Sequence, residues 1–111
     1  MKITTTDTYT TLTDERDDVM DFASYLERIV PEKYEALNLV VDLLKYEALT
    51  LDQLIAFLAL SNTQREAGKS FVVVNTGIDY DLVPEEMIVV PTLQEAEDIV
   101  QMEEIERDLG F

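Results

Sequence analysis

The chain has 111 residues and carries 24 acidic against 8 basic side chains, so its formal net charge is −16. Such a charge repels nucleic-acid phosphates and anionic lipid surfaces, which disfavours both as direct partners. The sequence contains neither cysteine nor histidine, and this excludes disulfides, thiolate nucleophiles, imidazole bases and the nitrogen and sulfur ligands of most transition-metal sites.

Length and composition predict a single domain over residues 1–111, because a hydrophobic content of 47% is ample for a core of its own. No apolar run has the length of a membrane-spanning helix, and residues 1–6 lack the apolar core of a signal peptide. We therefore expect a cytoplasmic protein. The missing residue types further lead us to expect no cofactor and no enzymatic activity.

The first half of the chain predicts two strands and a helix. Residues 2–12 are rich in threonine and tyrosine, which predicts one long strand or two short strands joined by a turn, at an edge of a sheet. Apolar residues then recur at three- and four-residue steps from Val19 to Val30, and this predicts a helix that Pro31 ends or kinks. The nearly continuous apolar run at 39–44 predicts a strand covered on both faces.

A second helix is predicted to begin at Thr50, which forms a capping-box pattern with Gln53, and to stop at Gly68. Residues 71–74 form another apolar run and predict a second covered strand. The buried stripe of the intervening helix is expected to contain Leu51, Leu54, Ile55 and Leu58.

The last third of the chain predicts an acidic loop at 75–86, a short strand at 87–90 and a helix at 93–108 that begins with a Thr92 cap. The apolar ending predicts that Phe111 docks onto the fold. The inward-facing residues of this helix are expected to be Leu93, Ala96, Ile99, Val100 and Met102.

Alternating strands and helices predict an α/β domain with a mixed four- to five-stranded sheet, a parallel core and flanking helices. In such sheets the functional surface lies where strands end and helices begin.

Five segments of the chain carry a resemblance in their order and spacing: Val40-Val41-Asp42-Leu43, Thr50-Leu51-Asp52-Gln53, Ala67-Gly68-Lys69, Val72-Val73-Val74-Asn75 and Pro91-Thr92-Leu93-Gln94-Glu95-Ala96. Over roughly residues 38–100 they resemble STAS domains, the anti-sigma-factor-antagonist family. The resemblance implies a mixed sheet packed with helices and a regulatory role in binding a kinase-like partner.

In that family the loop before the second helix reads Asp-Ser-Ser-Gly, and phosphorylation of the second serine controls binding. The resemblance places Asp52 at the phosphorylated serine and Thr50 at the family's aspartate, so the switch serine is absent. Two interpretations of Asp52 follow. The carboxylate could mimic a permanent phosphoserine with less charge, or it could simply occupy a favourable first helical turn.

Our leading hypothesis is a non-enzymatic STAS-like module that binds a protein partner with a basic surface. The alternative is a small-molecule or nucleotide sensor that uses the same strand ends. Both readings use the start of the second helix and the adjoining loop, where the candidate binding residues are Thr50, Asp52, Gln53, Asn75, Thr76, Asp79 and Tyr80.

Two further readings remain open. Residues 103–111 resemble small STAS-like bacterial proteins that carry the label ribonuclease Z, but a chain without histidine cannot build such a zinc site. That resemblance implies at most an accessory role beside an RNA-processing enzyme. The acidic loop could also collect oxygen ligands for magnesium or calcium, against the simpler reading of solvated acids: Asp79, Asp81, Glu85 and Glu86.

Overall fold

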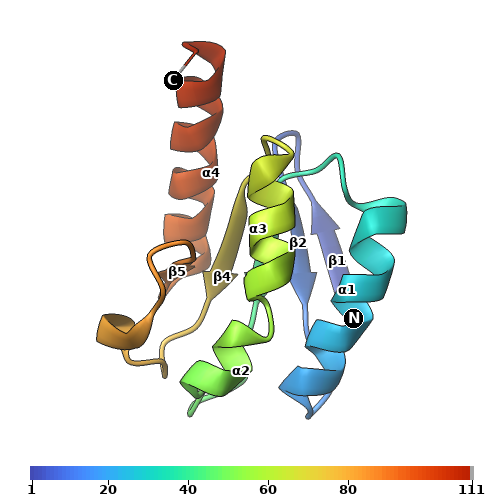
Figure 1. Ribbon diagram of the computed structural model, residues 1–111, viewed down its shortest axis with the longest axis vertical. Helices are drawn as coiled ribbons and strands as arrows, with labels where there is room; N and C mark the ends of the chain where they lie inside the picture. Colours follow the sequence, from blue (N-terminus) through green and yellow to red (C-terminus); the bar gives the residue numbers. More distant parts are fainter. Residues whose placement is uncertain (111) are drawn as a thin grey trace.

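Five strands form one mixed sheet in the computed structural model, which describes residues 1–110. Neighbouring strands follow chain order, β1-β2-β3-β4-β5, with β1 antiparallel to β2 and every other pair parallel. Figure 1 shows the arrangement. The elements are β1 Lys2–Thr5, β2 Thr10–Thr13, α1 Val19–Lys33, β3 Leu39–Asp42, α2 Leu51–Ile55, α3 Leu58–Glu66, β4 Phe71–Val74, the 3-10 helix η1 Tyr80–Leu82, β5 Ile88–Val90 and α4 Leu93–Asp108.

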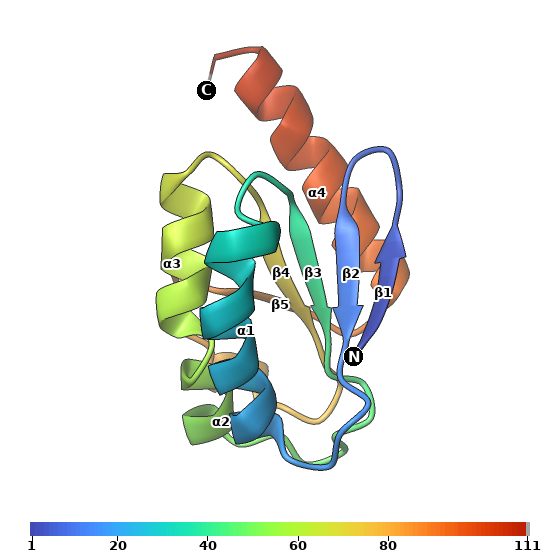
Figure 2. The same ribbon diagram turned by 90° about the vertical axis from the view of Figure 1, so that its right-hand side faces the viewer.

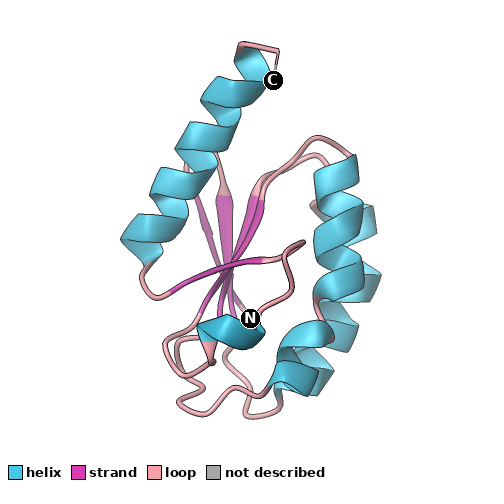
Figure 3. Ribbon diagram, turned by 60° about the vertical axis from the view of Figure 1, so that its left-hand side comes forward, coloured by secondary structure: helices cyan, strands magenta, loops and turns pink. Residues whose placement is uncertain are grey.

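The helices lie in two layers on either side of the sheet. Helices α1, α2 and α3 cover one face and α4 alone covers the other (Figures 2 and 3). The larger core, on the α1 side, includes the tilted ring pair of Phe22 and Phe57, whose centroids are 6.4 Å apart. The smaller core is formed by buried residues of β3, β4 and α4: Val40, Val72, Val74, Ala96 and Val100. The predicted α/β class with a parallel core is confirmed.

The N-terminal segment forms two short strands joined by a turn, the second of the two predicted alternatives. The hydroxyl of Thr6 accepts the N–H of Tyr9, 3.2 Å away, and so fixes the turn between β1 and β2. β1 lies at the edge of the sheet, and all four of its residues are exposed. The expected edge position is therefore confirmed.

The structure changes the bounds of both helices predicted before β4. Of the two alternatives for Pro31, the one in which it ends the first helix is wrong, because α1 continues through it to Lys33; a missing backbone N–H is tolerated in the last turn. That Pro31 kinks the helix stays a prediction. The second predicted helix is not continuous: α2 ends at Ile55 and α3 begins at Leu58. In the expected stripe only Leu54 is buried, and 41% of Ile55 is exposed.

Strand β4 and helix α4 have the bounds that the sequence predicts, whereas β3 and β5 are shorter than their apolar runs. Within α4, the prediction that Leu93 and Met102 face inward is wrong, because 44% and 50% of these side chains are exposed. The prediction for Phe111 concerns a residue outside the described range. Among residues 1–110, no helix is both long and apolar enough to cross a membrane.

Candidate functional site

The carboxyl ends of β2, β3, β4 and β5 meet at one edge of the sheet, at the lower end of the molecule in Figures 1 and 2. Three loops leave the strands there, at residues 14–18, 43–50 and 75–87. Helix α2 and the 3-10 helix η1 lie at the same end (Figure 1). We call the surface at this end of the strands the carboxyl edge, which is distinct from the lateral edge formed by strand β1. It holds all seven residues predicted to bind a partner.

Asn75 joins two of these loops from a fully buried position directly after β4. Its amide nitrogen donates to the carbonyl oxygens of Leu43 and Tyr46, at 2.9 and 2.8 Å. Its amide oxygen accepts the backbone N–H groups of Gly77 and Ile78, at 2.8 and 2.9 Å. Both donor hydrogens and both acceptor positions of the amide are thus used within the protein. The side chain therefore positions the loops rather than facing a ligand.

A second link joins the loop after β2 to the loop after β3. The carboxylate of Asp14, 3% exposed, accepts the backbone N–H of Arg16 at 2.7 Å and the hydroxyl of Tyr46. Burial and the bond to Asp14 raise the pKa of Tyr46 well above its ordinary value. Together with Asn75, this link makes the carboxyl edge one connected surface.

Replacing Tyr46 with phenylalanine should lower the free energy of unfolding by about 1.5 kcal/mol at neutral pH, because the bond to a carboxylate is lost. A pKa that is raised by folding contributes stability below the unfolded value of 10.0, and that contribution is lost as the pH rises above it. The wild type should therefore lose more stability than the variant in alkali. Urea unfolding at neutral pH and at about pH 11 measures this. A difference between the two proteins that stays constant with pH would refute the role given to Tyr46.

The start of α2 is built by the predicted capping box. The hydroxyl of Thr50 accepts the backbone N–H of Gln53 at 3.2 Å, and the side-chain oxygen of Gln53 accepts the backbone N–H of Thr50 at 2.9 Å. Both side chains are thus engaged in holding the helix start. Asp52 is exposed between them and forms no ion pair within the described residues.

The adjoining loop presents Thr76, Asp79 and Tyr80, all of which are exposed. The carboxylate of Asp79 caps η1 by accepting the N–H of Asp81 at 3.0 Å. The hydroxyl of Tyr80 donates to the carbonyl oxygen of Asn75, and burial together with the charge of Glu95 raises the pKa of Tyr80. The ring of Tyr80 is therefore held in place while 43% of the side chain stays exposed.

Exposed apolar side chains accompany these residues at the carboxyl edge: Leu44, Ile55, Tyr80 and Leu82. Sequence periodicity missed Leu44 and Ile55, because it assigned the first to a covered strand and the second to a buried stripe. Exposed carboxylates lie in the same three loops and in the first turns of α1 and α2: Glu15, Asp17, Asp18, Asp21, Glu47, Asp52, Asp79, Asp81, Glu85 and Glu86.

The two basic side chains of these loops are already engaged. Lys45 pairs with Asp17 at 3.2 Å and also donates to the carbonyl oxygen of Arg16. The guanidinium of Arg16 lies over the ring of Tyr25, 5.3 Å from its centroid. Apart from Asp17, which pairs with Lys45, and Glu15, which pairs with the amino group of Met1 at 3.2 Å, the exposed acids of the edge form no ion pair within the described residues. Within residues 1–110, no three acidic side chains form a group that could hold a metal ion.

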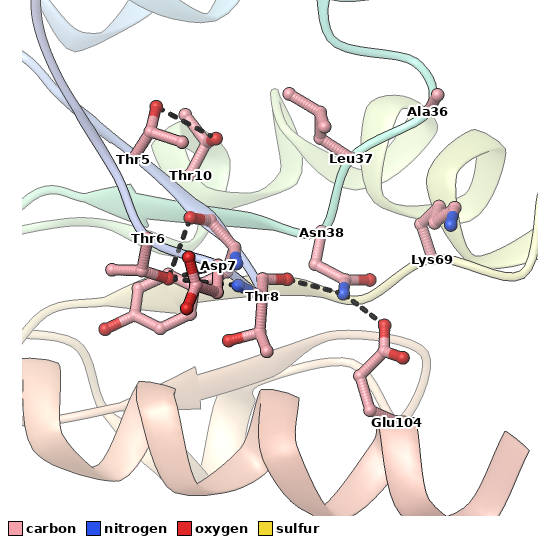
Figure 4. Close-up of a pocket in the computed structure, with 11 residues that line it drawn as sticks. Thr5, Thr6, Asp7, Thr8, Thr10, Ala36, Leu37, Asn38, Lys69 and Glu104 are labelled. Carbon is pink, nitrogen blue, oxygen red and sulfur yellow. Dashed lines mark hydrogen bonds between the residues drawn. The ribbon is translucent and has the colours of Figure 1, made fainter. Parts of the chain in front are cut away.

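The opposite edge of the sheet holds a hollow of about 240 Å³ that the sequence does not indicate (Figure 4). One wall is the turn of the β1–β2 hairpin. Asn38 crosses its floor, donating to the carbonyl oxygen of Thr8 at 2.8 Å and to the carboxylate of Glu104. Bonds from Asn38 and Arg107 lower the pKa of Glu104. These groups satisfy one another's hydrogen-bonding capacity. The contacts that line the hollow therefore attach the β1–β2 hairpin to α4.

Compared with models of known protein families and with curated proteins, the sequence matches none.

Proposed function

We propose that this chain is a non-enzymatic, cytoplasmic, STAS-like regulatory module that binds a protein partner with a basic surface. The binding surface is the carboxyl edge, centred on the start of α2 and the loop at 75–87. The observation that carries the proposal is the combination, at this edge, of uncompensated carboxylates with exposed Leu44, Ile55, Tyr80 and Leu82.

A protein partner suits this combination better than a small ligand does. Exposed aromatic and aliphatic side chains supply the apolar contacts of protein interfaces, and Tyr80 is already oriented by its bond to Asn75. The acidic surroundings would speed encounter with a basic surface and make the association sensitive to salt. The polar groups on which a ligand sensor would depend are largely committed, since Asn75 holds the loops and Thr50 and Gln53 cap α2.

The STAS resemblance would make the partner a kinase-like regulator, with Asp52 at its contact surface. Asp52 is exposed and unpaired within residues 1–110, so its carboxylate is available to a partner's lysine or arginine. A carboxylate carries about one charge where phosphoserine carries nearly two. The module would therefore present a permanent, weaker form of the phosphorylated state rather than a switch.

Reversing the charge at Asp52 and Asp79 should remove at least about nine tenths of the partner captured by the tagged protein, since each reversal turns attraction to a basic group into repulsion. The measurement is affinity capture from native cytoplasm at low and moderate salt, with quantitative mass spectrometry of prey and bait. Both residues are exposed, so the variant should remain folded, with a melting temperature only slightly lowered by the loss of the Asp79 cap on η1.

The matched control is charge reversal at Glu32 and Glu66, which are exposed near the ends of α1 and α3, at the opposite edge of the sheet. This variant has the same net charge as the Asp52 and Asp79 variant. Equal loss from the two variants would mean that only overall charge matters, and undiminished capture by the first would remove the carboxyl edge as the binding surface. If nothing is captured and a nucleotide or metabolite raises the melting temperature, the sensor alternative replaces the proposal.

A further inference from the structure

Helix α4 reverses its amphipathic character halfway along its length. In its first half the face toward the sheet is apolar, with Ala96 and Val100 fully buried against β3 and β4. In its second half the same face is polar and carries Glu103, Glu104 and Arg107. The second half extends beyond the ends of the strands (Figures 1, 2 and 3), so no apolar sheet surface lies beneath it.

A polar network attaches this second half to the fold. Glu103 pairs with Arg65 of α3 at 2.9 Å and accepts the hydroxyl of Ser70 at 2.6 Å. Arg107 donates to the side-chain oxygen of Asn38 at 3.2 Å and pairs with Glu104 at 3.1 Å. The inner face of the helix end is therefore occupied, and the orientation of its outer face is fixed.

The outer face of this second half carries a line of exposed apolar side chains. Met102, Ile105 and Leu109 are 50%, 60% and 66% exposed. Met102 and Ile105 lie in α4 and Leu109 is its C-cap residue with a right-handed helical backbone, so their spacing of three and four residues places them in one line. A line of this geometry is the pattern with which one helix packs against another. We call these three residues the α4 stripe.

Acidic residues flank the α4 stripe. Asp98 and Glu106 lie four residues before and after Met102, and Asp108 lies three after Ile105, so all three are on or beside the same face. All are exposed, and none forms an ion pair within the described residues. Packing two copies of the stripe together would bring these carboxylates face to face between chains that each carry a charge of −16.

We propose that the α4 stripe docks an amphipathic helix of another protein, one whose apolar residues are flanked by lysine or arginine. The apolar line supplies the contact and the flanking acids select the charge of the partner. This surface is separate from the carboxyl edge, because α4 runs from that edge to the opposite end of the molecule (Figure 1). Docking at the α4 stripe therefore does not depend on partner binding at the carboxyl edge.

The test uses a labelled synthetic peptide that forms an amphipathic helix with a leucine stripe flanked by lysines, titrated with the full chain and followed by fluorescence anisotropy. A matched peptide with glutamates in place of the lysines measures the contribution of charge. We expect the lysine peptide to bind and the glutamate peptide to bind at least tenfold more weakly. Equal binding of the two peptides would overturn the selection by charge.

Three variants test separately the apolar side chains of the α4 stripe, the flanking charges and the location of the binding site. Substituting Met102→Gln, Ile105→Gln and Leu109→Gln together keeps helix propensity and net charge, and should weaken binding at least tenfold. Substituting Asp98→Asn, Glu106→Gln and Asp108→Asn should weaken binding and reduce its salt dependence. The control, Ile55→Gln with Leu82→Gln, removes apolar groups of the carboxyl edge and should leave peptide binding unchanged.

Two outcomes would overturn the proposal. Undiminished binding by the glutamine variant of the stripe would show that the peptide attaches elsewhere through charge alone. A wild-type dimer in sedimentation that the same variant abolishes would show that the occupant is a second copy of the chain. Circular dichroism confirms that the variants remain folded, as expected for substitutions at exposed positions.

Discussion

Replacing Asn75 with alanine should lower the free energy of unfolding by about 3 kcal/mol, because four hydrogen bonds of a buried side chain are lost together. The carbonyl oxygens of Leu43 and Tyr46 lose their donor, and the N–H groups of Gly77 and Ile78 lose their acceptor. Alanine leaves all four of these groups without their side-chain partner. The stability of the carboxyl edge therefore depends on this residue more than on any of the other six predicted there.

Chemical denaturation of the wild type and the Asn75→Ala variant gives this difference directly. Thr76→Ala is the matched control, since Thr76 is the next residue, is exposed and should change stability by less than about 0.5 kcal/mol. If the Asn75 variant were as stable as this control, the joining of the two loops through the amide would be disproved.

Replacing Gly77 with alanine should cost about 2 to 3 kcal/mol, because the added methyl group has no space. A Cβ at this position would lie 1.9 Å from the carbonyl oxygen of Glu47, a backbone atom that cannot rotate away. The two loops would have to separate, and the bond from Asn75 to the carbonyl of Tyr46 would lengthen with them.

Gly68 provides the matched control because its situation is the reverse. A Cβ there meets nothing within 4 Å, but the residue has a φ of +78°, which disfavours any side chain. Gly68→Ala should therefore cost only about 1 kcal/mol, the typical penalty for a left-handed conformation. Thermal and urea unfolding of the two variants measure both values. A smaller loss at Gly77 than at Gly68 would show that the loops are not in close contact.

Sequence patterns predicted the elements whose signals are local. The apolar run of β4 and the Thr92 cap of α4 fixed those elements to the residue, and the capping box of Thr50 and Gln53 forms as expected. Gly68 takes the left-handed conformation that its position after α3 requires. Each of these features depends on residues within a few positions of one another, which is why one sequence suffices to locate them.

The features that sequence patterns missed depend on distant segments. Neither glycine nor proline marks the break between α2 and α3, where the buried ring of Phe57 packs against Phe22 of α1. In the sequence, Asn75 is predicted to be a polar residue at the end of a strand. It is buried and connects two loops only because the loop at 43–46 packs against it. Met102 was predicted to face inward with Ala96 and Val100, but it lies on the opposite face of α4, and the inward face of the second half carries Glu103, Glu104 and Arg107 instead.

The candidate-site residues differ in whether the structure leaves them exposed or uses them within the fold. Asp52, Thr76, Asp79 and Tyr80 are exposed as a binding role requires, whereas the amide of Asn75 is satisfied within the protein. Charge and exposed apolar area at the carboxyl edge follow from loops that converge only in three dimensions. The spacing of residues along the chain does not predict such a surface.

The strand order has a consequence for synthesis. Because every strand pairs with its neighbour along the chain, the sheet can grow one strand at a time as the polypeptide leaves the ribosome. Helices α1, α2 and α3 accompany that growth on one face, but within residues 1–110 the other face is covered by α4, 16 residues long. Until α4 emerges, Val40, Val72 and Val74 form an open apolar sheet surface. This sheet face is thus exposed to aggregation until α4 docks.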